Sequence, residues 1–272
     1  MGYEKVTGII SKETNTGDAD RFLTILTFEA GRIECFAKSI RKQKSKLSAT
    51  AGLFCYGEYQ LFNKNNRSTL TSGKLTENFY EIRNDIVRLT YAIHFLEVSR
   101  DVILEGEPFP EALKMLLNSL YMLSYTEKDP EIVSRVFELR MMSLSGFTPV
   151  LERCVNCGKD FELLRLNAGE HDGAVCRSTG ADMYFSAAAS GVLCGDGGCK
   201  RIDRRAVRIS EGTRRALKHI TQSKASEAFN FTVSEMVRRE LSEVIPKYLR
   251  YNMDREYSKL DYLNQLTIPE NR

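Results

Sequence analysis

The first eighty residues alternate between apolar and polar side chains, and turn residues break the alternation at short intervals. This period of two predicts short, half-buried strands, since successive side chains of a strand point to opposite faces. The predicted strands are Val6–Ile10, Phe22–Phe28, Ile33–Ala37, Leu53–Phe62 and Ser68–Lys74. Five short strands without an intervening helix favour a small closed barrel, of which the five-stranded OB-fold is the most common form. An SH3-like barrel would give a similar pattern.

From Phe79 the spacing of apolar residues lengthens to three and four, which predicts an amphipathic helix. Its apolar stripe consists of Phe79, Ile82, Ile86, Leu89, Ile93 and Leu96. A second predicted helix runs from Glu111 to about Ser124. A third begins at Asp129-Pro130-Glu131, where a capping residue, a proline and an acid follow one another, and it ends before Gly146. We interpret these stripes as core.

Five of the seven cysteines lie between Cys154 and Cys199, a cluster that favours metal binding over a disulfide framework. Cys154-x-x-Cys157 lets two thiolates reach one tetrahedral ion, and Gly158 permits the tight turn that follows. Cys194 and Cys199, separated by four residues, form the second half, with a small β-hairpin expected between the halves. Four thiolates fill the coordination of a zinc ion, so the predicted Zn²⁺ site is structural.

Other readings of the cysteines stay open at this point. Cys176 or His171 could replace one of the four ligands, the cluster could be a metal-free remnant, or its Cys-x-x-Cys could be a redox motif. Cys35 and Cys55 stand alone in apolar stretches, and we interpret them as small core residues.

Helical patterns return after the cysteine region. One helix opens at Ser210 and ends near Ile220, and a longer one runs from about Ser234, with Pro246 expected to kink or restart it. We therefore expect an α+β protein with an N-terminal OB-fold β-barrel and an α-helical domain that carries an inserted, zinc-ribbon-like zinc finger. The expected domains are residues 1–78, residues 79–150 together with 205–272, and residues 151–204.

A segment of fifteen residues contains six cations and only one acid, Glu34. Most of these cations lie in the stretch without a strand pattern that precedes the fourth predicted strand. The six are Arg32, Lys38, Arg41, Lys42, Lys44 and Lys46. A cationic loop beside a small barrel would bind the phosphates of single-stranded nucleic acid without reading its bases. A solvated surface loop is the alternative. Outward-pointing members of the set Phe54, Tyr56, Tyr59 and Phe62 could stack bases.

A second basic set follows the cysteine cluster. We predict that Arg201, Arg204 and Arg205 of this set also bind nucleic acid. Residues 200–272 carry sixteen Lys and Arg against ten Asp and Glu, a net charge of +6, and residues 1–80 carry twelve against eight, a net charge of +4. The net charge of the whole chain, +3, is too small to indicate a nucleic-acid partner by itself, so the prediction depends on this distribution.

The motifs of common catalytic sites are missing from the sequence. It has no phosphate loop, no Gly-x-Gly-x-x-Gly and no Gly-x-Ser-x-Gly, so we expect no enzymatic activity. Asp18, Asp20 and Arg21 form a polar knot that we interpret as a salt bridge pinning the barrel, with a catalytic acidic pair as the less favoured reading. No apolar run is long enough to span a membrane and the start lacks a signal-peptide core, so we expect a cytoplasmic protein without membrane contact.

Several local patterns, in this order along the chain, resemble the RecO family of bacterial recombination mediators. Gly17–Arg21 is similar to the family's Gly-Glu-x-Asp-Arg signature, and Gly31–Leu47 is similar to its third strand and basic loop. Three further matches are Phe79–Arg83 with Tyr91-Ala92, Gly146–Pro149 before Cys154, and Tyr248–Tyr251 with Ser258. The chain departs from the family at Asp18, in the longer spacer between Cys194 and Cys199, and at Asn252, where many members have histidine.

The resemblance implies an OB-fold followed by a helical domain with an inserted zinc finger. It also implies binding of single- and double-stranded DNA, annealing of complementary strands, and help in loading RecA onto DNA coated by single-strand-binding protein. Implied partners are DNA, RecR and the acidic C-terminal tail of single-strand-binding protein, with a place at the nucleoid. Two alternatives remain: a zinc-ribbon interaction adaptor without direct DNA binding, and a hydrolase with acids near Asp18 and Asp20.

Overall fold

The computed structural model describes residues 1–161, 182–195, 198–260 and 263, and the chain divides into two compact units. The first unit comprises residues 1–130 and the segment from Ser258, and the second comprises residues 131–257. The three expected domains placed all helices in one domain, whereas this division distributes them over both units. The boundaries of the expected domains stay a prediction.

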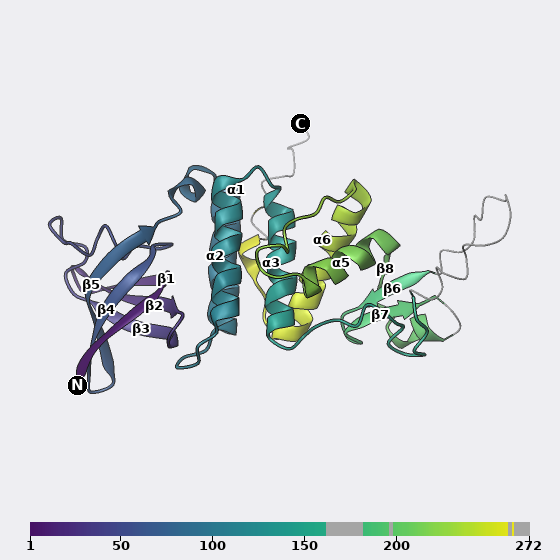
Figure 1. Cartoon of the computed structure of the whole chain (residues 1–272), viewed down its shortest axis with the longest axis horizontal. Coiled ribbons are helices and arrows are strands. Elements are labelled where there is room, and N and C mark those ends of the chain that lie inside the picture. Colours follow the sequence, from purple (N-terminus) through teal and green to yellow (C-terminus); the bar gives the residue numbers. More distant parts are fainter. Residues whose placement is uncertain (162–181, 196–197, 261–262, 264–272) are drawn as a thin grey trace. The chain divides into compact units, whose positions relative to one another are not determined.

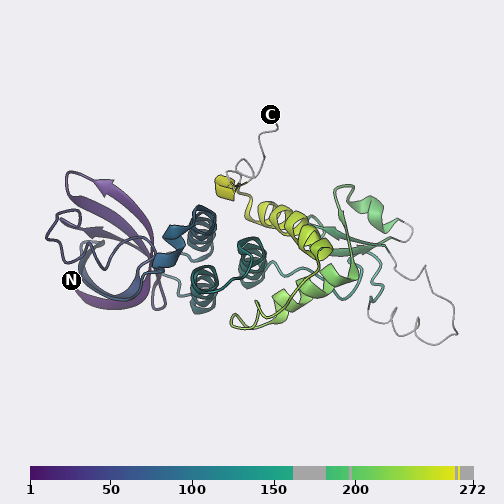
Figure 2. The same cartoon turned by 90° about the horizontal axis from the view of Figure 1, so that it is seen from above.

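Five strands of the first unit curve into a closed barrel (Figures 1 and 2). Each strand pairs with its neighbours, in antiparallel or parallel fashion. They are β1 (Gly2–Thr16), β2 (Asp20–Thr27), β3 (Gly31–Ala37), β4 (Tyr56–Lys64) and β5 (Arg67–Glu77). Their order around the barrel is β1-β2-β3-β5-β4, closed by the β1–β4 pair. The predicted fold class, a small OB-type barrel followed by helices and a cysteine module, is confirmed.

Alternation along each strand fills the barrel with apolar side chains. The core includes Val6, Ile10, Leu23, Ile25, Cys35, Ala37, Ile40, Ala51, Cys55, Tyr59, Leu61 and Leu70. The predicted burial of the two isolated cysteines is thereby confirmed, and burial raises the pKa of Cys35 to about 12. A thiol held protonated in this way is unreactive, so both cysteines belong to the core.

Three helical segments follow the barrel: the 3₁₀ turn η1 (Tyr80–Asn84), α1 (Ile86–Val102) and α2 (Pro110–Tyr125). The predicted start of the first helix, at Phe79, is therefore wrong, because α1 begins at Ile86. Asp85 adopts an extended conformation, and its carboxylate accepts hydrogen bonds from the N–H groups of Val87 and Arg88, which begins a new helix. The phase of the apolar stripe shifts at this break, so Ile86, predicted as core, is 56% exposed.

The C-terminal end of α1 covers one end of β3. The Arg32 guanidinium donates to the carbonyl of Arg100 at 2.7 Å, and the Arg32 N–H donates to the carbonyl of Leu104 at 2.9 Å. A Cβ on Gly31, which has a φ of 63°, would lie 2.3 Å from two carbonyl oxygens of this segment, so only glycine permits the approach. The opposite end of β3, at Ala37, leads into the basic segment.

The second unit combines helices with a three-stranded sheet of order β7-β6-β8. Its elements are α3 (Pro130–Leu144), β6 (Met183–Ser186), β7 (Gly191–Cys194), η2 (Cys199–Ile202), β8 (Val207–Ile209), α5 (Glu211–Gln222) and α6 (Glu235–Met253), and the 3₁₀ turn η3 (Ser258–Leu260) follows in the first unit. Side chains of Ser210 and Ser234 cap α5 and α6, which confirms both predicted starts. A kink or a restart was expected at Pro246, and the restart is wrong, because α6 continues through this residue. Among the described helices, none combines the length and apolar character needed to cross a membrane.

Candidate metal centre and nucleic-acid interface

The four cysteines predicted as metal ligands come together in the second unit. The Sγ atoms of Cys154, Cys157, Cys194 and Cys199 all lie within 4.8 Å of one another. Thiolates at about 2.3 Å from a tetrahedral zinc ion would be about 3.8 Å apart, and the Sγ atoms of Cys157 and Cys194 are 3.7 Å apart. The sulfur arrangement therefore fits one tetrahedral metal ion.

Backbone pairing brings the two halves of this site together. The N–H of Val192 donates to the carbonyl of Val150 at 3.0 Å, and the N–H of Val155 donates to the carbonyl of Val192 at 2.9 Å. These bonds hold the turn that carries the first two cysteines against β7, whose last residue is Cys194. A Cβ on Gly191 would lie 2.5 Å from the Val150 carbonyl oxygen, so the close approach requires glycine. The expected hairpin between the halves is β6–β7.

The backbone around Cys154 favours its thiolate form. Burial raises the pKa of this thiol, but hydrogen bonds from the backbone N–H groups of Cys157, Cys194 and Asn156 outweigh burial and lower the pKa to about 6. Because metals bind the thiolate, this environment prepares Cys154 as a ligand. The alternatives Cys176 and His171 lie outside the described residues.

The predicted basic loop is an exposed arc with both ends held by the barrel. Ile40 is buried in the barrel core and Leu47 packs against it. Between them Arg41, Lys42, Lys44 and Lys46 are exposed, as is Lys38 just before. Backbone turns hold the arc from within, with the N–H of Ser45 donating to the carbonyl of Lys42 at 2.9 Å. The structure therefore presents five predicted cations on one short, anchored segment.

The polar knot predicted around Asp18 has other partners than expected. Arg21 forms its ion pair with Glu13 at 2.8 Å. Asp20 Oδ1 accepts a hydrogen bond from the N–H of Ser39 at 2.5 Å, where Ser39 has a φ of 55°. Arg21 therefore makes a salt bridge that joins β2 to β1, as the salt-bridge interpretation predicted, and its acid is Glu13. Asp20 serves instead to hold the first turn of the basic loop.

Replacing Asp20 with alanine is expected to loosen the basic loop. A hydrogen bond to a charged group contributes about 1.5–3 kcal/mol, so trypsin should cleave at Arg41 and Lys42 about tenfold faster or more, because cleavage follows the population of open loop. Limited proteolysis with mass spectrometry measures the sites. Asp18→Ala removes the same charge from an exposed neighbour and should leave the rate unchanged. Equal rates for the two variants would contradict the role given to Asp20.

Arg32 lies apart from the loop cations. It stands five residues before Ala37 on β3, about 16 Å along the strand at ~3.3 Å per residue. Its guanidinium is held by the carbonyl of Arg100. The structure thus gives Arg32 a structural contact, and its contact with nucleic acid stays a prediction.

Two of the four aromatic side chains that the sequence suggested for stacking are unsuited to it. Phe54 and Tyr59 are buried in the described structure. Phe62 packs against Tyr3, with ring centroids 5.0 Å apart. The sequence-based interpretation missed Phe22 and Phe36, which are cross-strand partners on β2 and β3 with centroids 5.4 Å apart. Phe22 is 51% exposed, and an aromatic pair on the outward face of adjacent strands is the signal that could have identified it.

The second basic set divides into paired and available cations. Arg214 is fully buried and donates to Glu211 and to the carbonyl of Leu151. Ion pairs also hold Arg208 with Asp182, Arg215 with Glu211 and Lys218 with Glu152. The three residues predicted to bind nucleic acid are exposed, and no ion pair with another described residue is found for them. They are Arg201, Arg204 and Arg205.

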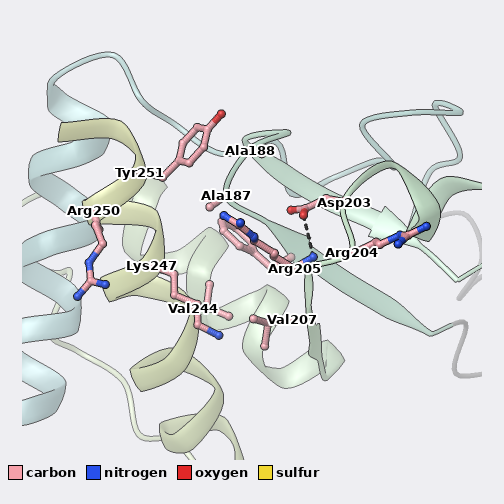
Figure 3. Close-up of a pocket in the computed structure, with 11 residues that line it drawn as sticks. Ala187, Ala188, Asp203, Arg204, Arg205, Val207, Val244, Lys247, Arg250 and Tyr251 are labelled. Carbon is pink, nitrogen blue, oxygen red and sulfur yellow. Dashed lines mark hydrogen bonds between the residues drawn. The ribbon is translucent and has the colours of Figure 1, made fainter. Parts of the chain in front are cut away.

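Two of these arginines border a pocket of about 800 Å³ between β8 and α6 (Figure 3). Its floor is apolar, with Phe185, Val207 and Val244 among the lining residues, and Lys247 and Arg250 add cations from α6. Figure 3 shows Arg205 extending toward α6, whereas Arg204 points the other way. Asp203 accepts hydrogen bonds from Ser186 and from the Arg205 N–H. Lys247 is paired with Glu243 and Arg250 with Glu256, so Arg204 and Arg205 are the lining cations for which no ion pair with a described acid is found. The pocket suits an anionic ligand with an apolar part.

Two family models cover the chain. The model described as recombination protein O N terminal matches residues 1–79, and the one described as recombination protein O C terminal matches residues 83–169 and 170–261. The first match ends where the barrel ends, and the second includes all four cysteines of the candidate metal centre.

Curated relatives match over nearly their full lengths. A DNA repair protein RecO of Acetivibrio thermocellus is 42% identical over 267 residues, which are 98% of this chain and 98% of that protein. One of Symbiobacterium thermophilum is 28% identical over 98% of each chain. One of Alkaliphilus metalliredigens is 27% identical over 92% of this chain and 94% of its own length.

Proposed function

The chain belongs to the recombination protein O family, and we propose that it is a DNA-binding mediator of recombinational repair that catalyses no reaction. The observation that carries this proposal is the anchored arc of exposed cations between Ile40 and Leu47. Phosphate contacts from such a segment bind single- or double-stranded DNA with little sequence preference. A protein that binds strands in this way could anneal complementary ones.

The partners of the proposal are those that the family resemblance implies. They are RecR, the acidic C-terminal tail of single-strand-binding protein, and RecA, which the protein would help to load onto coated single strands in the cytoplasm at the nucleoid. Positive charge on exposed residues of both units supports binding of DNA and of the acidic tail of single-strand-binding protein.

A strand-annealing assay tests this function. Complementary oligonucleotides, one labelled with a donor and one with an acceptor dye, should anneal faster with the protein than without it. The acceleration should persist when both strands are coated with single-strand-binding protein. If the protein binds neither strand and leaves both rates unchanged, the alternative of an interaction adaptor without direct DNA binding gains support and the mediator function fails.

We infer that the metal of the cysteine cluster is zinc and that it is structural. Four thiolates that can surround one ion tetrahedrally suit Zn²⁺. Because protein ligands then occupy all four coordination positions, no position is left for a reacting water. When bound, the ion would cross-link the turn of Cys154 and Cys157 to the end of β7 and the start of η2. Elemental analysis of the purified protein should find about one zinc per chain.

Arg201, Arg204 and Arg205 form the second part of the proposed DNA interface. Changing all three to alanine should lower the slope of log affinity against log salt by about 2, since each lost contact to single-stranded DNA removes about 0.7. The matched control changes the ion-paired cations Arg208, Arg215 and Lys218 and should leave the slope nearly unchanged. If the first variant keeps its slope but loses binding of an acidic peptide, the pocket beside α6 serves a protein tail and the DNA assignment is wrong.

A further inference from the structure

The strongest unassigned feature of the barrel is a groove of about 560 Å³ at the end of β3 that leads into the basic loop. Its lining residues are Phe22, Glu34, Cys35, Phe36, Asn66, Arg67, Ser68 and Thr69. The groove follows the line where β3 and β5 pair in parallel, with Cys35 opposite Ser68 and Phe36 opposite Thr69. It therefore lies along the β3–β5 pair of the barrel.

Two aromatic rings line this groove, Phe22 exposed and Phe36 half-buried. Along β2 and β3 the outward residues nearer the helices are covered: Leu26 is fully buried and Thr24 is 5% exposed. Toward the open end of the same strands this cover stops, and Phe22 is 51% exposed with Phe36 beside it. Exposing large apolar rings costs free energy that a polar residue would avoid, so the pair is suited to a ligand.

The charges around the rings indicate what that ligand is. Lys38, the first cation of the loop, is two residues beyond Phe36, about 7 Å along the chain at ~3.3 Å per residue. Arg67 and Glu34 are both exposed and both line the groove. The carboxylate of Glu34 disfavours a phosphate beside it, whereas Arg67 and Lys38 favour phosphates beside them. A polyanion that carries flat apolar groups meets both conditions.

We infer that Phe22 and Phe36 form a base-stacking site for single-stranded DNA, with the phosphates on either side held by the basic loop and Arg67. This inference deepens the proposed function and rests on it. Aromatic rings stack any base, and a neighbouring cation tracks the backbone. Bases in a duplex are already stacked on one another, so the site would select single strands, whereas the loop alone binds both forms.

The absence of tryptophan from the chain provides a direct test. Phe22→Trp introduces one indole into the groove, and its emission should be quenched by a thymine oligonucleotide but not by an abasic chain with the same number of phosphates. Tyr3→Trp is the matched control, because Tyr3 is 68% exposed and packs against Phe62 in a comparable aromatic pair. Its emission should change equally little with both strands.

Affinity measurements provide the second readout. Phe22→Leu with Phe36→Leu should weaken single-strand binding by about 5- to 150-fold for each stacked base and leave duplex binding unchanged. Equal quenching by the abasic chain, or equal losses for single strands and duplex, would overturn the stacking site while leaving the DNA-binding function intact. No binding of either form by the unaltered protein would end both.

Discussion

Replacing Cys194 with serine is expected to abolish metal binding and to unfold the sheet of the second unit, while the barrel stays folded. The ion would join three segments that are separated in the chain, so its binding free energy contributes directly to folding. Structural zinc in small fingers contributes about 10–16 kcal/mol in apparent binding free energy, and one lost thiolate removes much of it. The barrel has its own apolar core and needs no metal.

Three measurements check this result. Zinc content should fall from about one ion per chain to nearly none, heating should show an early transition, and the loop-dependent affinity for DNA should persist. Cys55→Ser is the matched control, because Cys55 is also buried but belongs to the barrel core. This control should keep its zinc. A metal-free protein, or a Cys194→Ser variant as stable as the unaltered protein, would refute the structural zinc site.

Removing the four cations of the arc is expected to produce the largest loss of DNA affinity. The variant carries alanine at Arg41, Lys42, Lys44 and Lys46. Four lost contacts to single-stranded DNA should lower the salt slope by about 2.8, at about 0.7 per contact. Between about 50 and 200 mM salt, the unaltered protein should therefore lose about 50-fold more affinity than the variant. Fluorescence anisotropy across this salt range measures both slopes.

The control for this variant removes the same charge from other places in the first unit. It changes Lys5, Lys74, Lys114 and Lys128 to alanine. The net charge then falls equally, but no segment loses its cations together, so the slope should stay close to that of the unaltered protein. Equal slopes for the two variants would mean that DNA responds to total charge and that the loop is ordinary surface.

Much of the fold could be predicted because its signals are local. Alternation over a few residues is sufficient to indicate a strand, and the capping residues Ser210 and Ser234 mark helix starts through their own backbone contacts. The prediction of the first helix failed because the apolar spacing does not show where a capping side chain interrupts a helix. At Asp85 a capping carboxylate ended one helical segment and began another, although the apolar spacing continued.

The clustering of the four cysteines was also predictable, for a different reason. Two thiolates close in the chain must reach one ion together, so the spacing of Cys154 and Cys157 restricts their geometry before the chain folds. The second half was less determined, because the longer spacer left Cys199 open to replacement by Cys176 or His171. The position of Cys199 became clear only from the Sγ distances.

The sequence by itself determined the strands, most helix boundaries, the cysteine pairs and the cationic loop, since each depends on residues near one another in the chain. Only the tertiary structure decided which of these residues face solvent. Arg32 and Arg214, cations like those of the loop, are held by distant carbonyls, whereas Phe22, an apolar residue, is left exposed. Exposure depends on which element covers which face, and that covering is set by contacts between residues far apart in the chain.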